Sequence, residues 1–346
     1  MTTAERRNLA RALGLIMAGI LTIVVIIAGL QFLLGYAQVE SAPAGWQIIR
    51  PPGEVYTLLI ANDTVWTGGK DGLILVDRQS GALLPLPGSP PQLSYVRAIV
   101  QDRSGDVWIG HDGGLVRYEN GVWRTIAPAA GIPFVKTLSL IERKDGSLVA
   151  GSTEGVFTFN GSVWTDLVPA AGPVPVTADA LFEDRDGNLW VGCVSPTHGG
   201  LYFLNRTGWF ELTSRDPLLH ASARMITQRR DGSVWVAAGF ANIGGAVVLR
   251  NGTWSNLTVR DGLAGEATRN VFEDRAGRMW VGSEYDGIAV LDRDRWTIIT
   301  TKEGLAGQEV KCMAEDQNGT MWLGTNGGLN RVDGAAIYAG IRQDPV

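Results

Sequence analysis

Four basic side chains occupy the same position relative to a glycine that recurs along the sequence. Arg97 precedes Gly105, Arg224 precedes Gly232, Arg269 precedes Gly277 and Lys311 precedes Gly319, each by the same eight positions. Converging guanidinium and ammonium groups suit carboxylate, sulfate or phosphate ligands. We therefore predict an anion-binding ring if the fold brings these positions together. The alternative is that each cation pairs with an acid of a neighbouring repeat. The same slot holds Tyr56, Leu138 and Asp179 in the other copies.

Histidine and cysteine, the usual catalytic and metal-binding residues, are scarce in this chain, which has three and two of them. His111 and Cys193 follow the second strands of two predicted units that lie two repeats apart, so a thiol–imidazole pair within hydrogen-bond reach is not expected. No two histidines have the spacing of zinc ligands. The sequence predicts no catalytic residue, metal site or cofactor, and His111 is kept only as a candidate ligand contact.

Loop lengths point to a second group of candidate contacts. The segment between the second and third strands is longest in the fourth and fifth copies, which contain Val194-Ser195-Pro196-Thr197-His198 and Phe240-Ala241-Asn242-Ile243. Loop extensions on a regular scaffold are common places for function, although drift at a tolerant surface gives the same pattern. The candidates on this face, called the top, are Ser195, His198, Phe240, Asn242, Tyr285 and Asp286.

The elements that would position these residues are seven copies of one repeat. EDRDGNLWVG at Glu183–Gly192 recurs as QDRSGDVWIG, EDRAGRMWVG and EDQNGTMWLG, and three looser copies complete the set. Each copy reads as strand, tight turn with glycine, strand, then Gly-Gly or Asp-Gly and a third strand. Asn-Gly turns, as at Asn120-Gly121, lead to a fourth strand with a second tryptophan.

The period of the repeat is regular and close to 42 residues. Successive second-strand positions, six tryptophans and Leu148, are separated by 42, 40, 42, 45, 45 and 42 residues, and the other six tryptophans mark the fourth strand. Four strands per unit at this period predict an all-β, seven-bladed β-propeller of antiparallel blades. We expect the tryptophans to pack between blades, since a lone sheet cannot bury both faces.

The pattern E-D-x-x-G-x-x-W-V-G followed by G-G-L closely resembles the two-component regulator propeller repeat, over about Trp46 to Val332. In that family such propellers form the extracytoplasmic sensory part of membrane receptors, usually ahead of histidine-kinase modules. The resemblance implies a sensory propeller. Here no kinase or helix-turn-helix segment follows the last repeat, so we expect no kinase module in this chain.

Two features predict how the ring closes and how it is oriented. Trp46-Gln47-Ile48-Ile49 matches the fourth-strand pattern without the first three strands before it, while the last repeat lacks a tryptophan fourth strand. We expect the N-terminal strand to complete the last blade and remove an open edge; the alternative is that Ala335–Ala339 supplies it. The Asp-x-x-Gly turns then lie at the bottom, facing the membrane, and the variable loops face away.

The N-terminal region predicts a membrane anchor. Residues 1–11 form a cytoplasmic N-terminus, Ala12–Tyr36 a transmembrane helix, 37–45 a linker and 46–346 the propeller. Cleavage as a signal peptide is the alternative, but the apolar stretch is long for one. Arg6, Arg7 and Arg11 place the N-terminus in the cytoplasm and the propeller outside.

Small residues also form one stripe on this helix and could contact another membrane helix. They are Ala10, Gly14, Ala18 and Thr22.

The net charge of −5 argues against nucleic acid as a partner. The sequence thus favours a membrane-anchored, non-catalytic sensory or scaffold module that binds a protein, glycan or peptide on its top face. Two alternatives stay open: a propeller lyase or hydrolase acting on an anionic saccharide, and an accessory subunit of a membrane protein complex.

Overall fold

The computed structural model describes residues 42–126, 135–167, 175–195, 199–215, 222–240, 243–334 and 336. The chain divides into two compact units, Met1–Ala42 and Pro43–Val346. The predicted transmembrane helix, the residues before it and its small-residue stripe lie outside the described residues, as does nearly all of the linker. Within the described ranges no helix has the length and apolar character needed to cross a membrane.

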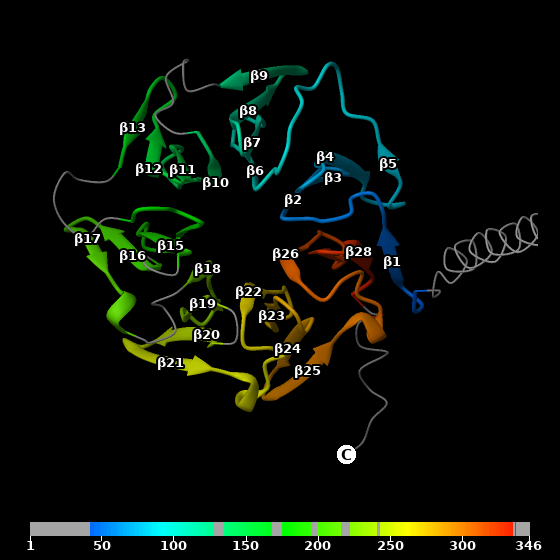
Figure 1. The fold of residues 1–346 in the computed structure, drawn as a ribbon, viewed down its shortest axis with the longest axis vertical. Coiled ribbons are helices and arrows are strands. Elements are labelled where there is room, and N and C mark those ends of the chain that lie inside the picture. The colour runs from blue at the N-terminus through cyan, green and yellow to red at the C-terminus, as the bar shows by residue number, and fades with distance from the viewer. Residues whose placement is uncertain are drawn as a thin grey trace, which may run out of the picture. The chain divides into compact units, whose positions relative to one another are not determined.

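Seven four-stranded antiparallel sheets form the second unit and surround a central axis (Figure 1). The prediction of a seven-bladed β-propeller is confirmed. Blade 1 consists of β2 (Thr57–Ala61), β3 (Thr64–Gly69), β4 (Gly72–Asp77) and β5 (Leu83–Leu84). Blade 2 consists of β6 (Ala98–Gln101), β7 (Val107–His111), β8 (Gly114–Glu119) and β9 (Val122–Ile126). Blade 3 consists of β10 (Thr137–Glu142), β11 (Leu148–Ser152), β12 (Gly155–Phe159) and β13 (Trp164–Asp166).

The remaining blades repeat this plan. Blade 4 consists of β14 (Ala180–Glu183), β15 (Leu189–Cys193), β16 (Gly200–Asn205) and β17 (Gly208–Glu211). Blade 5 consists of β18 (Ala223–Gln228), β19 (Val234–Phe240), β20 (Ile243–Arg250) and β21 (Thr253–Leu257). Blade 6 consists of β22 (Thr268–Glu273), β23 (Met279–Ser283), β24 (Ile288–Asp292) and β25 (Arg295–Ile299). Short 3-10 helices η2 (Thr213–Arg215), η4 (Val259–Asp261) and η5 (Thr301–Glu303) follow the outer strands of blades 4, 5 and 6.

Blade 7 is completed by the N-terminal strand, as predicted. β26 (Val310–Glu315), β27 (Met321–Thr325) and β28 (Gly328–Val332) are followed in the sheet by β1 (Trp46–Ile49). The register pairs Trp46 with Val332 and Ile49 with Leu329. The two ends of the repeat region are therefore joined within one sheet, and this blade has no unpaired outer edge at β28.

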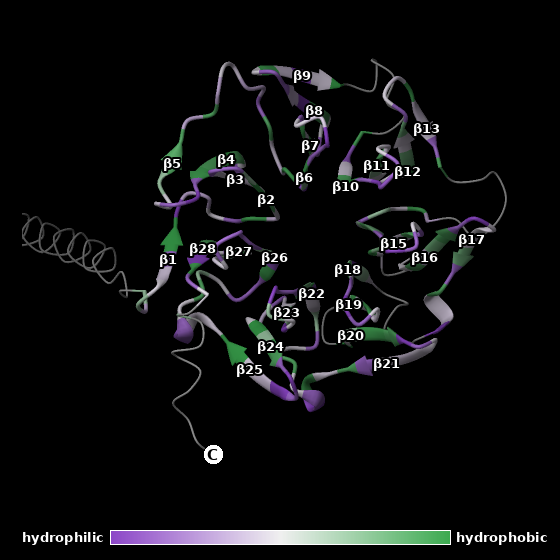
Figure 2. Ribbon diagram, turned by 180° about the vertical axis from the view of Figure 1, so that it is seen from behind, coloured by the Kyte–Doolittle hydropathy of each residue, from purple (hydrophilic) through white to green (hydrophobic). Residues whose placement is uncertain are grey.

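The tryptophans pack between adjacent blades. Trp108 of blade 2 is 2% exposed, and its ring centroid lies 6.5 Å from that of Trp164 in blade 3. Trp66 and Trp123 form the same contact between blades 1 and 2, at 6.3 Å. Trp46 packs against the cluster that contains Trp280 of blade 6, so the N-terminal strand takes part in this contact too. Coloured by hydropathy, strands such as β4, β20 and β24 are hydrophobic, and hydrophilic residues gather in the turns (Figure 2).

A small residue in the second strand of each blade allows neighbouring blades to approach closely. A Cβ added at Gly192 in β15 would lie 2.2 Å from the carbonyl oxygen of Ala223 in the next blade. A Cβ at Gly110 in β7 would lie 2.4 Å from Thr137 Cγ2. The glycine that follows Trp-Val in the repeat is therefore explained by packing close to the central axis.

The Asp-x-x-Gly turns at the bottom are linked from blade to blade by hydrogen bonds. Arg185 donates through its guanidinium to the carbonyls of Arg229 (2.9 Å) and Arg230 (3.1 Å) in the next blade, and its backbone N donates to Gln228 Oε1 (3.0 Å). Equivalent contacts occur at Arg103, Lys144 and Arg230. We call this set of contacts the bottom belt. The basic residue after the repeat aspartate thus joins blades together.

Candidate functional site

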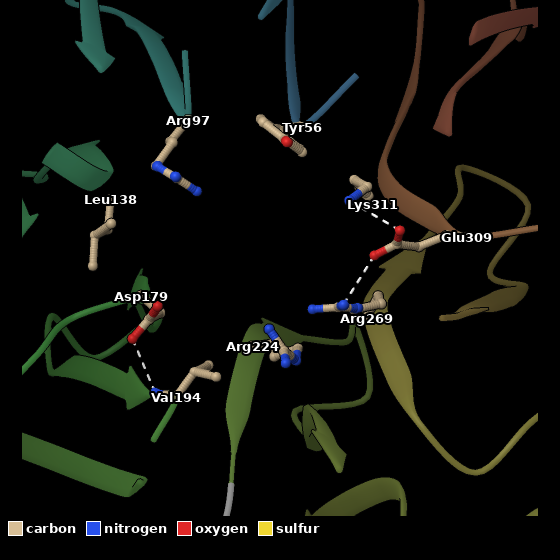
Figure 3. A pocket seen from close by; sticks show the side chains of 9 residues that line it. All are labelled: Tyr56, Arg97, Leu138, Asp179, Val194, Arg224, Arg269, Glu309 and Lys311. Carbon is tan, nitrogen blue, oxygen red and sulfur yellow. Dashed lines mark hydrogen bonds and ion pairs between the residues drawn. The ribbon is translucent and has the colours of Figure 1, made fainter. Parts of the chain in front are cut away.

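The seven residues that the repeat alignment placed in one slot line a single cavity at the mouth of the central channel (Figure 3). Its volume is about 210 Å³. The nine lining residues are Tyr56, Arg97, Leu138, Asp179, Val194, Arg224, Arg269, Glu309 and Lys311. We call this cavity the mouth cavity. All seven blades contribute to it, one residue each from the start of the innermost strand.

In four of the seven blades a β-bulge places the slot residue opposite no partner in the next strand. In blade 5 the register passes from Ala223 paired with Ala238 to Met225 paired with Ala237, and Arg224 between them has no partner across the strand. The same shift leaves Leu138, Arg269 and Lys311 as extra residues in their strands. A bulge bends the strand and redirects one side chain, and such irregularities are common beside functional sites.

Three of the four cations in the mouth cavity pair with carboxylates. Arg97 Nε lies 2.6 Å from Asp112. Arg269 Nη2 lies 2.5 Å from Glu284 and 3.0 Å from Glu309. Lys311 Nζ lies 2.8 Å from Glu54 and 3.0 Å from Glu309. The alternative that each cation pairs with an acid of a neighbouring repeat therefore holds for Arg269 with Glu309 and for Lys311 with Glu54, whereas Arg97 pairs with Asp112 of its own blade.

Arg224 differs from the other three cations. No hydrogen bond or ion pair joins its side chain to any residue in the part of the chain that the structure describes. Its Nε is shielded from solvent and has no hydrogen-bond partner. Burial, followed by repulsion from Arg269, lowers the pKa of Arg224. A half-buried cation without a contacting acid is energetically costly, and such groups are common at binding sites.

Asp179 supplies an acceptor on the wall next to Arg224 (Figure 3). Its Oδ2 accepts hydrogen bonds from the backbone N of Val194 (2.9 Å) and from Thr177 Oγ1 (3.1 Å). No described residue donates to its Oδ1. Burial raises the pKa of Asp179, and the backbone hydrogen bond, Thr177 and the two nearby guanidinium groups oppose this shift only in part.

An aromatic wall completes the cavity. The ring of Tyr56 lies 5.7 Å from the guanidinium carbon of Arg97 and 4.7 Å from Lys311 Nζ. Its hydroxyl donates to Glu54 Oε2 at 3.2 Å. Burial, together with Glu54, raises the pKa of Tyr56 to about 12. Tyr56 therefore stays neutral and presents a ring face to cations. Tyr95 stacks on Tyr56 at 6.4 Å and extends this wall outward.

The remaining predicted contacts are not part of the mouth cavity. His111 is buried, and its Nδ1 accepts a hydrogen bond from the backbone N of Gly113 (3.2 Å), so it holds the turn after β7. Tyr285 is 58% exposed and donates to Glu284 at 3.0 Å, while Asp286 contacts Ser283 at 3.3 Å. Ser195 accepts a backbone hydrogen bond from Gly199.

Three further candidates cannot be placed. His198, Asn242 and the side chain of Phe240 lie outside the described residues.

Five lining residues were not among the predicted contacts. Tyr56, Leu138 and Asp179 occupy the repeat slot, whereas Val194 just after β15 and Glu309 just before β26 lie outside it. The signal that could have identified Glu309 is its position two residues before Lys311. In the part of the chain described, no group of three His, Cys, Asp or Glu side chains could hold a metal ion.

The blade geometry defines the chain as a seven-bladed β-propeller, each blade contributing one residue to the channel mouth. Residues 90–113, 172–195 and 304–327 match the family model described as two component regulator propeller. Three segments of the chain therefore match this repeat, as the motif predicted.

Solved structures with the same fold come from proteins of different activity. An extracellular domain assigned to a hybrid two component system of B. thetaiotaomicron has a TM-score of 0.74 and 16% identity, covering 88% of this chain and 43% of that one. Virginiamycin B lyase from Staphylococcus aureus has a TM-score of 0.60 and 14% identity, covering 83% and 98%. YCF48 bound to D1 peptide has a TM-score of 0.63 and 14% identity, covering 84% and 97%.

These identities show a shared fold alone. The chain spans less than half the length of the two component system domain. No curated protein sequence matches the chain.

Proposed function

We propose that this chain is an extracytoplasmic binding module, sensory or scaffolding, that recognises a protein, glycan or peptide ligand on its top face without catalysis. The observation that carries the proposal is the mouth cavity, where one residue from each of seven blades converges on about 210 Å³. Convergent polar groups in a concave site are the usual form of a small-ligand site.

The two faces of the propeller support this choice of face. At the bottom, arginine and lysine side chains of successive turns are engaged in the bottom belt. At the top, Ile243 at the start of β20 is 73% exposed and Tyr285 in the loop after β23 is 58% exposed. These exposed side chains at the top are available to contact a partner.

The extracytoplasmic location is also part of the proposal. It is supported by the repeat family and by the fold shared with an extracellular domain from B. thetaiotaomicron. We propose that Ala12–Tyr36 anchors the chain, with the N-terminus in the cytoplasm and the propeller outside. Contact with another membrane helix through Ala10, Gly14, Ala18 and Thr22 stays a prediction.

The test is a binding screen with a turnover readout. The full-length chain in nanodiscs is exposed to glycan and peptide panels, and bound and unbound material is analysed for products. We expect binding without product, and binding should be lost in Ile243→Asp or Tyr285→Arg at the top. Asp186→Arg, in a bottom turn, is the matched control and should bind normally.

Two results would contradict the proposal. Product formation would favour the lyase or hydrolase alternative. Binding that is lost in Asp186→Arg but kept in both top variants would place recognition on the opposite face.

A further inference from the structure

Most charged groups around the mouth cavity are paired with each other, and two that line the cavity are not. Arg97, Arg269 and Lys311 are held by Asp112, Glu284, Glu309 and Glu54 at 2.5–3.0 Å. The two lining charges left are Arg224, which contacts no described acid, and Asp179, whose Oδ1 receives no hydrogen bond from a described residue. One cation and one acceptor thus remain available to a ligand.

We propose that the mouth cavity binds a small carboxylate that also carries a hydrogen-bond donor, a hydroxyl or an ammonium group. The ligand's carboxylate pairs with Arg224, and its donor is accepted by Asp179. This inference rests on the proposed function and specifies the chemistry of its ligand. The guanidinium group is planar and its paired N–H donors match the two oxygens of a carboxylate. Arg224 offers one guanidinium group, and the carboxyl of Asp179 on the adjacent wall disfavours a second negative charge, which favours a monocarboxylate over a phosphate dianion.

The volume of the cavity and its apolar lining residues indicate the size of this ligand and the nature of its carbon skeleton. The volume of the mouth cavity is about 210 Å³. It lies below the roughly 300–1,000 Å³ of pockets that enclose drug-sized ligands, which indicates on the order of ten non-hydrogen atoms. Leu138 and Val194 offer apolar contacts, and the ring face of Tyr56 offers an aromatic one. The ligand therefore carries an apolar or sugar-like carbon body between its polar ends.

Two matched ligand series test the assignment on the full-length chain in nanodiscs, by calorimetry and thermal shift. The first series is leucine, 2-hydroxyisocaproate, 4-methylpentanoate and leucinamide, which differ only in the donor or the carboxylate. The second is glucuronate and glucose. We expect a donor-bearing carboxylate of at least one series to bind about tenfold or more tightly than its partner without the carboxylate. Preference for leucine over 2-hydroxyisocaproate identifies the donor as ammonium, and the reverse identifies it as hydroxyl.

Substitutions assign the roles to the two residues. Arg224→Met keeps the length of the stem and removes the charge, so carboxylate binding should fall about tenfold or more. Because the wild-type charge contacts no acid, the unliganded variant should melt no lower than the wild type. Asp179→Asn should reduce the preference for the donor-bearing ligand over 4-methylpentanoate. Arg124→Gln removes an exposed charge from the outer strand β9 and should bind like the wild type.

Three results would overturn the inference. The first is that no carboxylate of either series binds. The second is binding that Arg224→Met leaves unchanged. The third is a large fall in the melting midpoint of unliganded Arg224→Met and Arg224→Lys alike, which would make Arg224 a structural residue. If these occur while the top-face variants still abolish binding of a panel ligand, the proposed function stands and only the ligand chemistry is wrong.

Discussion

In four of the seven repeats, a single aspartate joins the bottom turn to the blade core. In blade 4, Asp184 accepts hydrogen bonds from the indole Nε1 of Trp190 (2.9 Å) and from the backbone N of Asp186 (3.0 Å) and Asn188 (2.9 Å). Asp102 and Asp274 hold Trp108 and Trp280 in the same way, each at 2.8 Å. The tryptophan can therefore be buried without an unsatisfied N–H group.

Asp184→Ala should lower the free energy of unfolding by about 1–3 kcal/mol, because buried N–H groups lose their acceptor. Urea denaturation followed by tryptophan fluorescence measures this loss. Asp186→Ala, in the same turn but with an exposed side chain, is the control and should cost much less. Equal losses in the two variants would show that the turn, and not the buried acceptor, sets the stability.

Asp179 gives a pH-dependent prediction. Burial raises its folded-state pKa above the ordinary value of 3.8, so its contribution to stability is fully present below that value and is lost as pH rises through the folded pKa. Asp179→Asn should therefore match the wild type near pH 3.5 and become more stable than it toward pH 7. Chemical denaturation across this range measures the difference. A difference in unfolding free energy between Asp179→Asn and the wild type that stays constant with pH would contradict a raised pKa of Asp179.

At the scale of the blade, close approach of sheets near the axis depends on a small residue two positions after the second-strand tryptophan. The position is Gly192 in blade 4 and Ala237 in blade 5. A methyl group at Gly192 would meet the carbonyl oxygen of Ala223 at 2.2 Å, a distance that forces the blades to shift.

Gly192→Ala should cost about 1–3 kcal/mol, as overpacking of a tight contact does. Ala237→Gly, at the equivalent position that already accepts a methyl group, should cost only about 0.5–1 kcal/mol, the penalty for glycine in a strand. Thermal unfolding of the two variants provides the comparison. A larger loss for Ala237→Gly would argue against inter-blade contact as the reason for the glycine.

The regular elements could be predicted from sequence because their spacing is fixed. The hairpin glycine and the tryptophans located the strands, and the slot eight residues before the glycine located one residue per blade at the mouth cavity. The pairing of three cations was not predicted, because the repeat slot alone does not show which other positions fold back to the channel mouth. Asp112 and Glu284 share one such position, 15 residues after Arg97 and Arg269. The repeat motif contains the basic residue of the bottom belt, directly after the aspartate. Its hydrogen bonds could not be predicted from the motif, because they join the turns of adjacent blades.

For the whole molecule, closure of the ring depends on four residues of the N-terminal strand. Gln47 of β1 lies opposite Arg331 of β28. Directly opposite residues of an antiparallel pair have Cα atoms about 4.5–5.5 Å apart, within the range that a disulfide spans.

The double variant Gln47→Cys with Arg331→Cys should form this disulfide and tie the two ends of the propeller. Oxidation should raise the unfolding free energy by roughly 3–5 kcal/mol relative to the reduced form of the same variant, which is its own control. Non-reducing electrophoresis and thermal unfolding measure both outcomes. Failure to oxidise would indicate that β1 does not pair with β28 in solution.

The proposed topology can be tested with the same chemistry in whole cells. Cys193 and Cys312 are buried, so a membrane-impermeant maleimide should give little background. Tyr285→Cys should be labelled in cells with a permeabilised outer membrane. Thr3→Cys should be labelled only after lysis. Labelling of Thr3→Cys before lysis, or protection of Tyr285→Cys, would reverse the orientation.

The bulge at the start of the innermost strands has a consequence for how such proteins diversify. Where it occurs, it exposes one side chain to the channel while the rest of the strand keeps its pairing, so replacing that residue leaves the blade intact. In these four blades the slot residue can therefore vary with little effect on strand pairing, and the slot supplies one residue per blade to the mouth cavity. Related propellers can therefore acquire new ligands by substitution of these slot residues, without changes to the strands that form the blades.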